Sequence, residues 1–471
     1  MPKERLDPTL LKLCGVLAVG AFAPLLDSTI VSVAVDALAD DLGAPTTTVQ
    51  WVSTAYLLAF AMVMPVSGWA GDRFGTRRVW LGALVLFLVG SLLCACAWSV
   101  GSLVVFRSVQ GAGGGLMMPV LQTIVIRASG GRQVGRLVAV VSLPALLGPV
   151  LGPVFGGLLL GHLDWRWIFY VNLPVCVLAL FLAWRGVPPD PRQRASRLDV
   201  VGLVLVCPGL TALVYGLSQC GGQDGAGGGR VLLPMAAGAV LVAAFVGRSL
   251  RSSAPLIDMG LFRLRSFAAS SVLMFVGGSI MYGGMFLLPL YCQVVLDKGV
   301  VATGLLLVPQ GVGALAARVA GVLTDRIGPR PVVVTGLLLS AVATWPFVAS
   351  VGEGSVVAVA LFLRGLGTSA VNLAVTVGAY QGLEDSQVAD ASTTTRILQQ
   401  LGGSFGIAAL AVLLQRGGHT ATAFAHAFGL TAALALCAVI AAALLPGREP
   451  RPQRLWRQPQ DGPDGFRKGR A

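Results

Sequence analysis

Long, continuously apolar runs separated by short polar segments dominate this sequence. A helix needs about 20 mostly apolar residues to cross a bilayer, whereas the strands of a membrane barrel show short alternating patterns. The pattern therefore predicts an all-α polytopic membrane protein with fourteen transmembrane helices. The predicted helices lie at 13–35, 48–70, 79–98, 101–126, 134–160, 167–184, 200–217, 231–247, 267–291, 302–323, 331–350, 355–379, 397–415 and 422–445.

The sequence also contains an internal repeat. The segment GWAGDRFGTRR, starting at Gly68, recurs as GVLTDRIGPR, starting at Gly321, and Arg107 and Arg364 are arginines within corresponding apolar runs. Further matches follow in the same order, QV at 133–134 with QV at 387–388 and LGPVLG at 147–152 with LGGSFG at 401–406. Parallel six-helix repeats with a binding site at their interface are a recurrent transporter architecture.

The repeat predicts two six-helix bundles in the same orientation, with two helices inserted between them. The expected division is an N-terminal bundle at 1–198, two linker helices at 199–250, a C-terminal bundle at 251–445 and a disordered basic cytoplasmic tail at 446–471.

Composition supports a membrane protein and the charge sets its orientation. The 471 residues are 55% hydrophobic and only 12% charged, about half the charge of a typical soluble domain. The net charge of +13 could suggest nucleic-acid binding. However, 27 of the 34 Lys and Arg residues fall in segments on one predicted side and 4 on the other. Because cytoplasmic loops are rich in Lys and Arg, the charge predicts cytoplasmic termini in the inner membrane and no nucleic-acid partner.

Several motifs carry a family resemblance. They are G-x-x-x-D-R-x-G-x-R-R from Gly68, FRSVQGAGGG around Arg107, GPVLGPVFGG at 148–157, LDSTIVSVAV at 26–35 and WRWIFYVNLP at 165–174. With them the chain resembles the fourteen-span drug:proton antiporters of the major facilitator superfamily over nearly its whole length. The motif at 26–35 departs from the family pattern at Ser32 and Asp36, where Asn and Pro are usual.

The resemblance implies roles for two loops and one helix. The loop motif would latch the two halves on the cytoplasmic side in one state, through Gly68, Asp72, Arg73, Gly75, Arg77 and Arg78. Its second copy contains Gly321, Asp325, Arg326, Gly328 and Arg330. The antiporter motif, which marks exporters in the family, contains Gly148, Pro149, Gly152, Pro153, Gly156 and Gly157.

These motifs also have plain physical interpretations. Short basic loops satisfy topology alone, but topology does not require Asp72, which could accept N–H groups at a helix N-terminus, or Gly75, which permits a tight turn. Glycines at four-residue steps allow close helix packing, and Pro149 and Pro153 would bend their helix. Ordinary tight packing remains an alternative for this run.

Asp27 is the only carboxylate well inside a predicted helix. A charged acid there costs at least ~2.5 kcal/mol, so it needs a partner or a role. Counting 1.5 Å per residue from the outer helix ends places Asp27 and Arg107 at a similar depth, roughly 9–12 Å. A static ion pair between helices would explain both residues. A proton switch also would, because loading a proton or a cation on Asp27 would release Arg107.

A few other polar residues lie within the predicted helices. Gln310, Arg364, Asn372 and Gln399 could face a central cavity, although polar residues in spans often only bridge helices. Arg318 lies near a helix end, where snorkelling explains it.

The leading hypothesis is secondary active export of hydrophobic or cationic small molecules, such as drugs, antibiotics and dyes, by proton antiport. The expected partners of this monomer are its substrate, protons and the lipid bilayer, and no cofactor or metal is expected. Import or export of a specific metabolite is the alternative within transport. An enzyme would need clustered catalytic groups in the spans, and an ATP-driven pump a phosphate-binding loop; the sequence contains neither. A receptor or structural role stays open.

Overall fold

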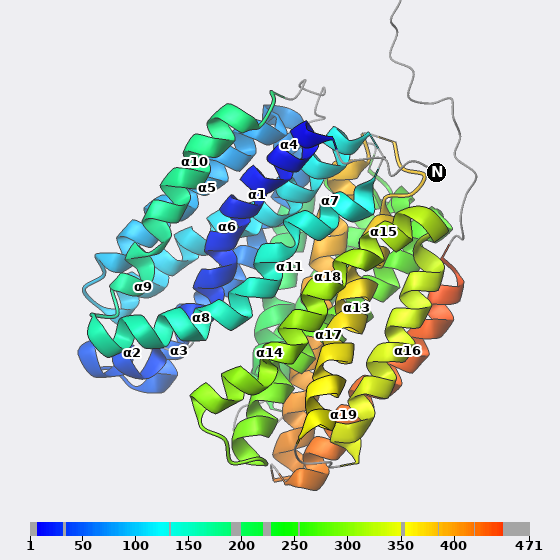
Figure 1. Cartoon of the computed structure of the whole chain (residues 1–471). Coiled ribbons are helices and arrows are strands. Elements are labelled where there is room, and N and C mark those ends of the chain that lie inside the picture. Colours follow the sequence, from blue (N-terminus) through cyan, green and yellow to red (C-terminus); the bar gives the residue numbers. More distant parts are fainter. Residues whose placement is uncertain are drawn as a thin grey trace, which may run out of the picture.

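The computed structural model describes residues 7–31, 34–130, 133–189, 199–219, 228–252, 255–349, 354–384, 386–418 and 420–445. Across these ranges every regular element is a helix (Figure 1). Helices satisfy their own backbone hydrogen bonds, which lipid cannot do. The prediction of an all-helical membrane protein is therefore confirmed.

Two sets of helices follow the two halves of the sequence. The first contains α1 (Pro8–Ile30), α2 (Val35–Asp41), α3 (Thr46–Val63), α4 (Val66–Phe74), α5 (Thr76–Ala95), α6 (Val100–Ser129), α7 (Val134–Val141), α8 (Leu143–His162), α9 (Trp167–Tyr170) and α10 (Asn172–Gly186). The hairpin α11 (Val200–Ser218) and α12 (Gly229–Ser249) follows. The second contains η2 (Met259–Arg263), α13 (Arg265–Val294), α14 (Val300–Ala316), α15 (Arg318–Ile327), α16 (Pro329–Val348), α17 (Ser355–Ala379), α18 (Val388–Arg416) and α19 (Ala421–Ala443).

The number of membrane-spanning helices in the described residues is lower than fourteen. Twelve helices are long and apolar enough to cross a membrane, or thirteen if α3 and α4, which meet at an angle of 55°, count as one span. The run expected at 134–160 is divided into α7 and α8 at Ser142. The helix assignment then continues without interruption through Pro149 and Pro153, so the break in this run precedes both prolines.

Two expected helix boundaries were wrong. The first helix was expected to reach residue 35, but α1 ends at Ile30 and α2 begins at Val35. The apolar residues beyond Ile30 instead form a core cluster with Trp165 and Phe169, so apolarity there reflects packing rather than a longer span. The thirteenth helix was expected from residue 397, but α18 begins at Val388.

The longer α18 changes the place of two charged residues that were assigned to a loop. Asp390 lies in its first turn and accepts the Asp258 N–H at 3.1 Å. Arg396 lies six residues further along α18 and donates to Gln399 Oε1 at 2.9 Å. Because both charges have polar partners, this polar stretch can form helix where hydropathy alone predicted loop.

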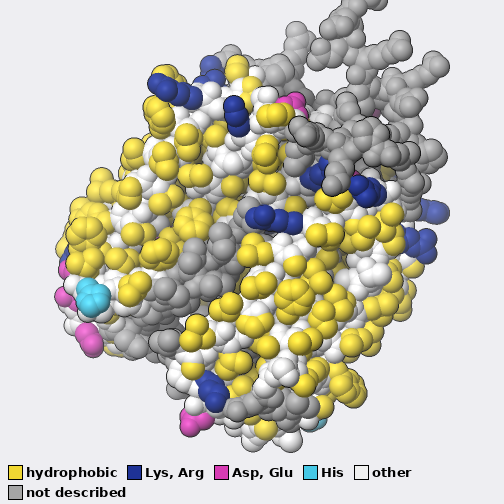
Figure 2. All heavy atoms as spheres, viewed as in Figure 1, with side chains coloured by type: hydrophobic (Ala, Val, Ile, Leu, Met, Phe, Trp, Pro, Cys, Tyr) yellow, Lys and Arg dark blue, Asp and Glu magenta, His cyan; other side chains and the backbone are white. Residues whose placement is uncertain are grey.

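The two bundles meet most closely at the end that holds α4, α7 and α15, and they diverge toward the opposite end (Figure 1). We call the first end the loop end, because it carries the loops after Phe74 and Ile327. Figure 2 shows that apolar side chains cover the sides of the molecule and that Lys and Arg gather mainly toward the loop end. Such a belt fits a protein that is surrounded by lipid.

The α11–α12 hairpin lies against both bundles. Helix α11 packs on α3 and on α18, and the Trp51 and Tyr215 rings stack with centroids 5.7 Å apart. Met64 from the first bundle and Ile397 from the second share a core cluster with α11 residues. The hairpin thus covers one of the two seams between the bundles.

An ion pair at the loop end ties the hairpin together. Asp199 caps α11 by accepting the Gly202 N–H at 2.9 Å, and Arg248 of α12 donates to the same carboxylate oxygen at 2.8 Å. Burial acts to raise the pKa of Asp199, but hydrogen bonds from Arg248 and Gly202 outweigh burial and hold that pKa below its ordinary value of 3.8.

Asp199→Asn is expected to lower the thermal stability of the purified protein at neutral pH. A carboxyl whose pKa is lowered by folding stabilises the fold above its unfolded pKa, and this contribution is lost as the pH falls through the folded pKa. Melting curves at several pH values test this. The difference in Tm from wild type should persist at pH 7 and pH 5 and shrink below about pH 4. A difference that is absent at pH 7 would contradict the role of the pair.

Candidate functional site

The structure places Asp27 of α1 and Arg107 of α6 in direct contact inside the first bundle. Arg107 Nη1 lies 2.5 Å from Asp27 Oδ2, and the two side chains are 1% and 0% exposed. Asp27 is one turn before the end of α1, and Arg107 is two turns into α6. The pair is thus fully removed from solvent, where its charges interact more strongly than at a surface.

Two amide side chains complete the surroundings of the Asp27 carboxylate. Gln110 Nε2 and Asn172 Nδ2 donate to Asp27 Oδ1 at 3.0 and 2.8 Å. Gln110 Oε1 accepts from Arg107 at 2.6 Å, and its Nε2 also donates to Ser91 Oγ at 2.7 Å. The carboxylate therefore has three donors from α6 and α10, which is the satisfaction that a buried anion requires.

Aromatic rings enclose the guanidinium of Arg107. Its Cζ lies 4.1 Å from the centroid of the Tyr56 ring on α3 and 5.8 Å from that of Phe169. Arg107 Nε also donates to the Val52 carbonyl at 3.4 Å. Arg stacks well on aromatic faces, so the ring partners hold the cation in place without competing for Asp27.

Glycines on α6 allow this close assembly. A Cβ at Gly113 would lie 2.6 Å from the Phe87 nitrogen of α5, and one at Gly111 would overlap the Tyr56 carbonyl of α3. The glycine-rich segment after Arg107 is therefore a packing surface that brings α3 and α5 against α6.

Gln110 and Asn172 were not among the predicted site residues. Both lie within motifs that the sequence did reveal, FRSVQGAGGG and WRWIFYVNLP. An amide within an apolar run is the only signal that each gives. Their convergence on Asp27 depends on helix packing between segments 145 residues apart.

Asn172→Ala is expected to destabilise the protein, because it removes one donor from a buried carboxylate. The expected loss is about 1–3 kcal/mol of unfolding free energy, measured as a lower Tm in detergent or nanodiscs. Asn372→Ala is the matched control, since the Asn372 amide donates to a neutral sulfur, Met281 Sδ, at 3.9 Å. Equal effects of the two substitutions would contradict the importance of the Asp27 contact.

The two loop motifs have different contacts across the molecule. Asp72 of α4 accepts from Arg127 at 2.8 Å within its own bundle. Asp325 of α15 instead accepts the Gly135 N–H at 3.0 Å, at the start of α7 in the other bundle. The N-terminal contact that the sequence suggested for Asp72 is thus seen for its second copy.

Glycines set the geometry of this end. Gly75 and Gly328, which end α4 and α15, both have a positive φ of 89°, which glycine adopts without steric cost. A Cβ at Gly321 would lie 2.5 Å from the Gly135 carbonyl oxygen, so the backbones of α15 and α7 are in contact. Gly68 of α4, the counterpart of Gly321 in the repeat, lies against Asp390 and Thr393 of α18.

The arginines of these loops lie mostly at the surface. Arg77 donates to the Trp184 carbonyl and is partly buried. The others are exposed, and they are Arg73, Arg78, Arg326 and Arg330. An exposed position suits interaction with water or lipid headgroups.

The antiporter motif lies on α8. Gly152 is buried, and a Cβ there would overlap Thr29 of α1, so α1 and α8 pack closely at this glycine. Gly156 is buried as well and Gly157 is exposed. The side-chain surroundings of Gly148, Pro149 and Pro153 lie outside the described residues.

A cavity of about 170 Å³ lies in the second bundle and is lined by Gln310 and Arg364, among others. Gln310 and Arg364 were predicted to face a central cavity; this cavity is lined by residues of the second bundle. Asn372 and Gln399 are not part of its lining; they contact Met281 and Arg396 as described above.

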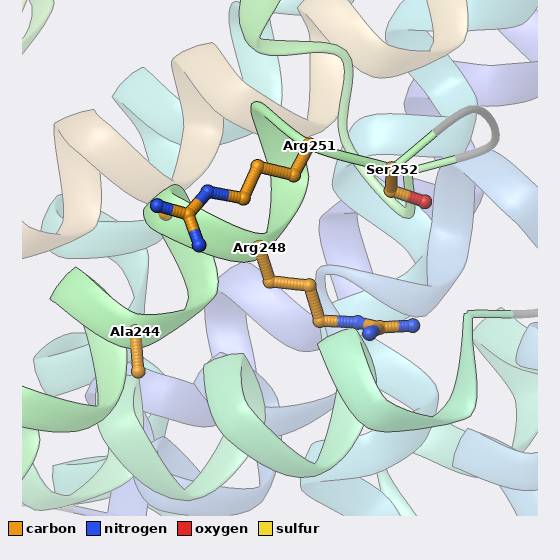
Figure 3. A pocket seen from close by; sticks show the side chains of 5 residues that line it. Ala244, Arg248, Arg251 and Ser252 are labelled. Atoms are coloured by element: carbon orange, nitrogen blue, oxygen red, sulfur yellow. The ribbon is translucent and has the colours of Figure 1, made fainter.

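A second hollow, of about 500 Å³, lies at the end of α12 (Figure 3). Its lining residues are Ala244, Gly247, Arg248, Arg251 and Ser252. It contains none of the predicted site residues and lies on the hairpin rather than between the bundles.

Two bundles of membrane helices, with an acid–arginine pair buried in the first, define a polytopic membrane protein. The sequence model of the Major Facilitator Superfamily matches residues 17–407, and again 308–468. The chain therefore belongs to the Major Facilitator Superfamily, a family of secondary transporters and not of enzymes.

Relatives and solved structures agree with this assignment. The chain is 40% identical over 417 residues, 87% of its length, to a protein named "Multidrug resistance protein B homolog" from Mycobacterium tuberculosis, covering 77% of that protein. It is 29% identical to a "Putative multidrug resistance protein MdtD" from Serratia proteamaculans, covering 86% of this chain and 85% of that one. The human transporter MFSD10 shares the fold, with a TM-score of 0.64, 18% identity and coverage of 93% and 100%.

Proposed function

We propose that this protein exports hydrophobic or cationic small molecules, such as drugs, antibiotics and dyes, in exchange for protons. The observation that carries the proposal is the Asp27–Arg107 pair with its amide donors. Other ion pairs between described residues have at least one more exposed partner, whereas both side chains of this pair are at most 1% exposed.

The chemistry of this pair supports the proposed proton coupling. Protonation of Asp27 removes the charge that holds Arg107 Nη1 at 2.5 Å, so the guanidinium would be left as a buried, unbalanced cation. The state in which Arg107 finds other partners is then favoured. Conversely, a bound cationic substrate would compete with Arg107 for the carboxylate. Proton and substrate would thus bind alternately, which is antiport.

Alternating access would take place between the two bundles. The contacts of α15 with α7 and of α4 with α18 support a state closed at the loop end. Opening would separate Gly135 from Gly321 and Asp325, while the bundles approach each other at the opposite end.

The substrate class rests on the relatives and on one carboxylate. Proteins 40% and 29% identical are named for multidrug resistance. A single acid in an apolar bundle suits monovalent cations that are otherwise apolar, since Coulomb attraction strengthens at low dielectric.

The proposed topology has fourteen spans, in which α3 with α4 and α7 with α8 each cross once. The loop end and both termini would then face the cytoplasm, and the protein would act as a monomer in the bacterial inner membrane. The proposed bundles keep the limits 1–198 and 251–445, with the hairpin at 199–250.

Ethidium efflux in everted membrane vesicles tests the proposal. Uptake into the vesicles should follow formation of a proton gradient and stop when the gradient is collapsed with a protonophore. Vesicles without the protein give the background. Transport that runs equally fast without a gradient would refute antiport, and transport of neither ethidium nor other dyes would favour a specific metabolite.

A further inference from the structure

Arg364 of α17 is a buried cation without a partner in the described part of the chain. Its side chain is 1% exposed, and none of its three guanidinium nitrogens has a hydrogen-bond partner there. Burying an unpaired charge is among the most unfavourable arrangements in a protein. A guanidinium kept in this state is poised to receive an anion.

The sequence repeat shows which residues near Arg364 correspond to the carboxylate that pairs with Arg107. Arg364 is the counterpart of Arg107, and the 254-residue offset that relates Gly152 to Gly406 leads from Asp27 to Met281 of α13. One turn further, a Cβ at Gly284 would lie 2.7 Å from Arg364 Nη1. The second bundle therefore keeps the arginine but has Met281 and Gly284 where the first bundle presents a carboxylate.

The cavity of about 170 Å³ lies where that carboxylate is absent. Arg364, Gln310 and Thr368 are among its polar lining residues, and Met281, Leu288 and Leu307 are among its apolar ones. Drug-sized sites are about 300–1,000 Å³, so this cavity fits one end of a molecule. A guanidinium binds a carboxylate through two parallel N–H donors, and methionine adapts to varied apolar shapes.

We propose that this cavity binds the carboxylate end of an anionic amphiphile, with the carboxylate on Arg364 and an apolar ring or chain against Leu288 and Leu307. The inference deepens the proposed function, on which it rests, by adding compounds that carry a carboxylate to the substrates. The ligand carboxylate balances the charge of Arg364, as the Asp27 carboxylate balances that of Arg107 in the first bundle.

Equilibrium binding to the full-length protein in nanodiscs tests this inference, with radiolabelled 1-naphthylacetate and the matched alcohol 1-naphthaleneethanol as probes. Wild type should bind the acid at least about tenfold more tightly than the alcohol, since charge-assisted hydrogen bonds contribute more than neutral ones. Arg364→Gln should abolish this preference and leave binding of the alcohol intact. Arg364→Lys should retain part of it, because lysine keeps the charge but not the paired donors.

Two controls separate binding from a structural role. Arg318→Gln makes the same change in charge at an exposed position on α15 and should keep the preference for the acid. Without ligand, Arg364→Gln should keep or raise the Tm, because it removes an unpaired buried charge; a purely structural arginine would instead lower the Tm when replaced. Equal binding of acid and alcohol to wild type, or undiminished acid binding by Arg364→Gln, would overturn the inference.

Two further measurements identify the kind of anion that the cavity selects and test the proposed export separately from binding. If chloride at the concentration of the acid displaced it completely, the site would select a small inorganic ion, and the amphiphile proposal would fail. Ethidium efflux measured on the same preparation reports on export alone. Loss of ethidium efflux with acid binding intact would refute the proposed function and leave the cavity assignment standing.

Discussion

Asp27→Asn should abolish dye transport driven by a pH gradient, down to the level of vesicles without the protein, while expression and membrane insertion stay normal. The amide keeps the size of the side chain and a carbonyl acceptor for Asn172, but it cannot take up a proton. Arg107 then has no carboxylate at position 27 from which it can separate and with which it can pair again. Everted vesicles with an imposed gradient measure the effect. Asp41→Asn is the matched control, because Asp41 is an exposed acid paired with Arg166.

A second variant separates a proton switch from a static ion pair. Asp27→Asn combined with Arg107→Gln removes both charges, so it relieves the penalty of an unpaired buried arginine. If the pair only held helices together, the double variant would recover transport that Asp27→Asn had lost. A proton switch predicts that the double variant is stable but still inactive. Gradient-driven transport at the wild-type rate in Asp27→Asn would refute the switch directly.

Gly321→Leu should reduce transport at least about tenfold by preventing closure at the loop end. Even a Cβ at Gly321 would lie 2.5 Å from the Gly135 carbonyl oxygen, and overpacking typically costs about 1–3 kcal/mol. This penalty applies only when α15 and α7 touch, so the open arrangement becomes favoured. Ethidium efflux measures the loss. Spin labels on Arg185→Cys and Arg265→Cys, in a variant without native cysteines, should report a longer distance across the loop end.

Gly82→Leu provides the comparison for this substitution. Gly82 lies on α5, where no atom is within 4 Å of an added Cβ, so the same change in side chain should leave transport and distance nearly unchanged. An unaltered spin-label distance in Gly321→Leu would show that the α7–α15 contact does not control closure.

Hydropathy located a helix at every predicted run, because burial in lipid leaves a signal that is about 20 residues long. It failed where apolar residues serve protein packing, as beyond Ile30, where the run continues into a core with Trp165. It failed also at the start of α18, where Asp390 and Arg396 are polar but have partners inside the protein. Local composition cannot distinguish a partnered charge from a solvated one.

The candidate site was only partly accessible from sequence. Asp27 and Arg107 stand out because charges are rare in apolar runs, and counting residues gave them similar depths. Gln110 and Asn172 are neutral, and only the packing of α6 and α10 around α1 reveals that both donate to one carboxylate. The empty space beside Arg364 was equally hidden, since a cavity depends on which side chains are absent from a neighbouring helix.

The α11–α12 hairpin makes the two seams between the bundles unequal. On one side, α11 lies against both α3 and α18 and shares a cluster with Met64 and Ile397; on the other, α8 and α14 meet directly. A hydrophobic compound dissolved in the surrounding lipid therefore encounters a covered seam on one flank and a bare helix pair on the other. Under the proposed function, a substrate that enters from the bilayer would therefore reach the bundles at the α8–α14 seam and not at the seam that the hairpin covers.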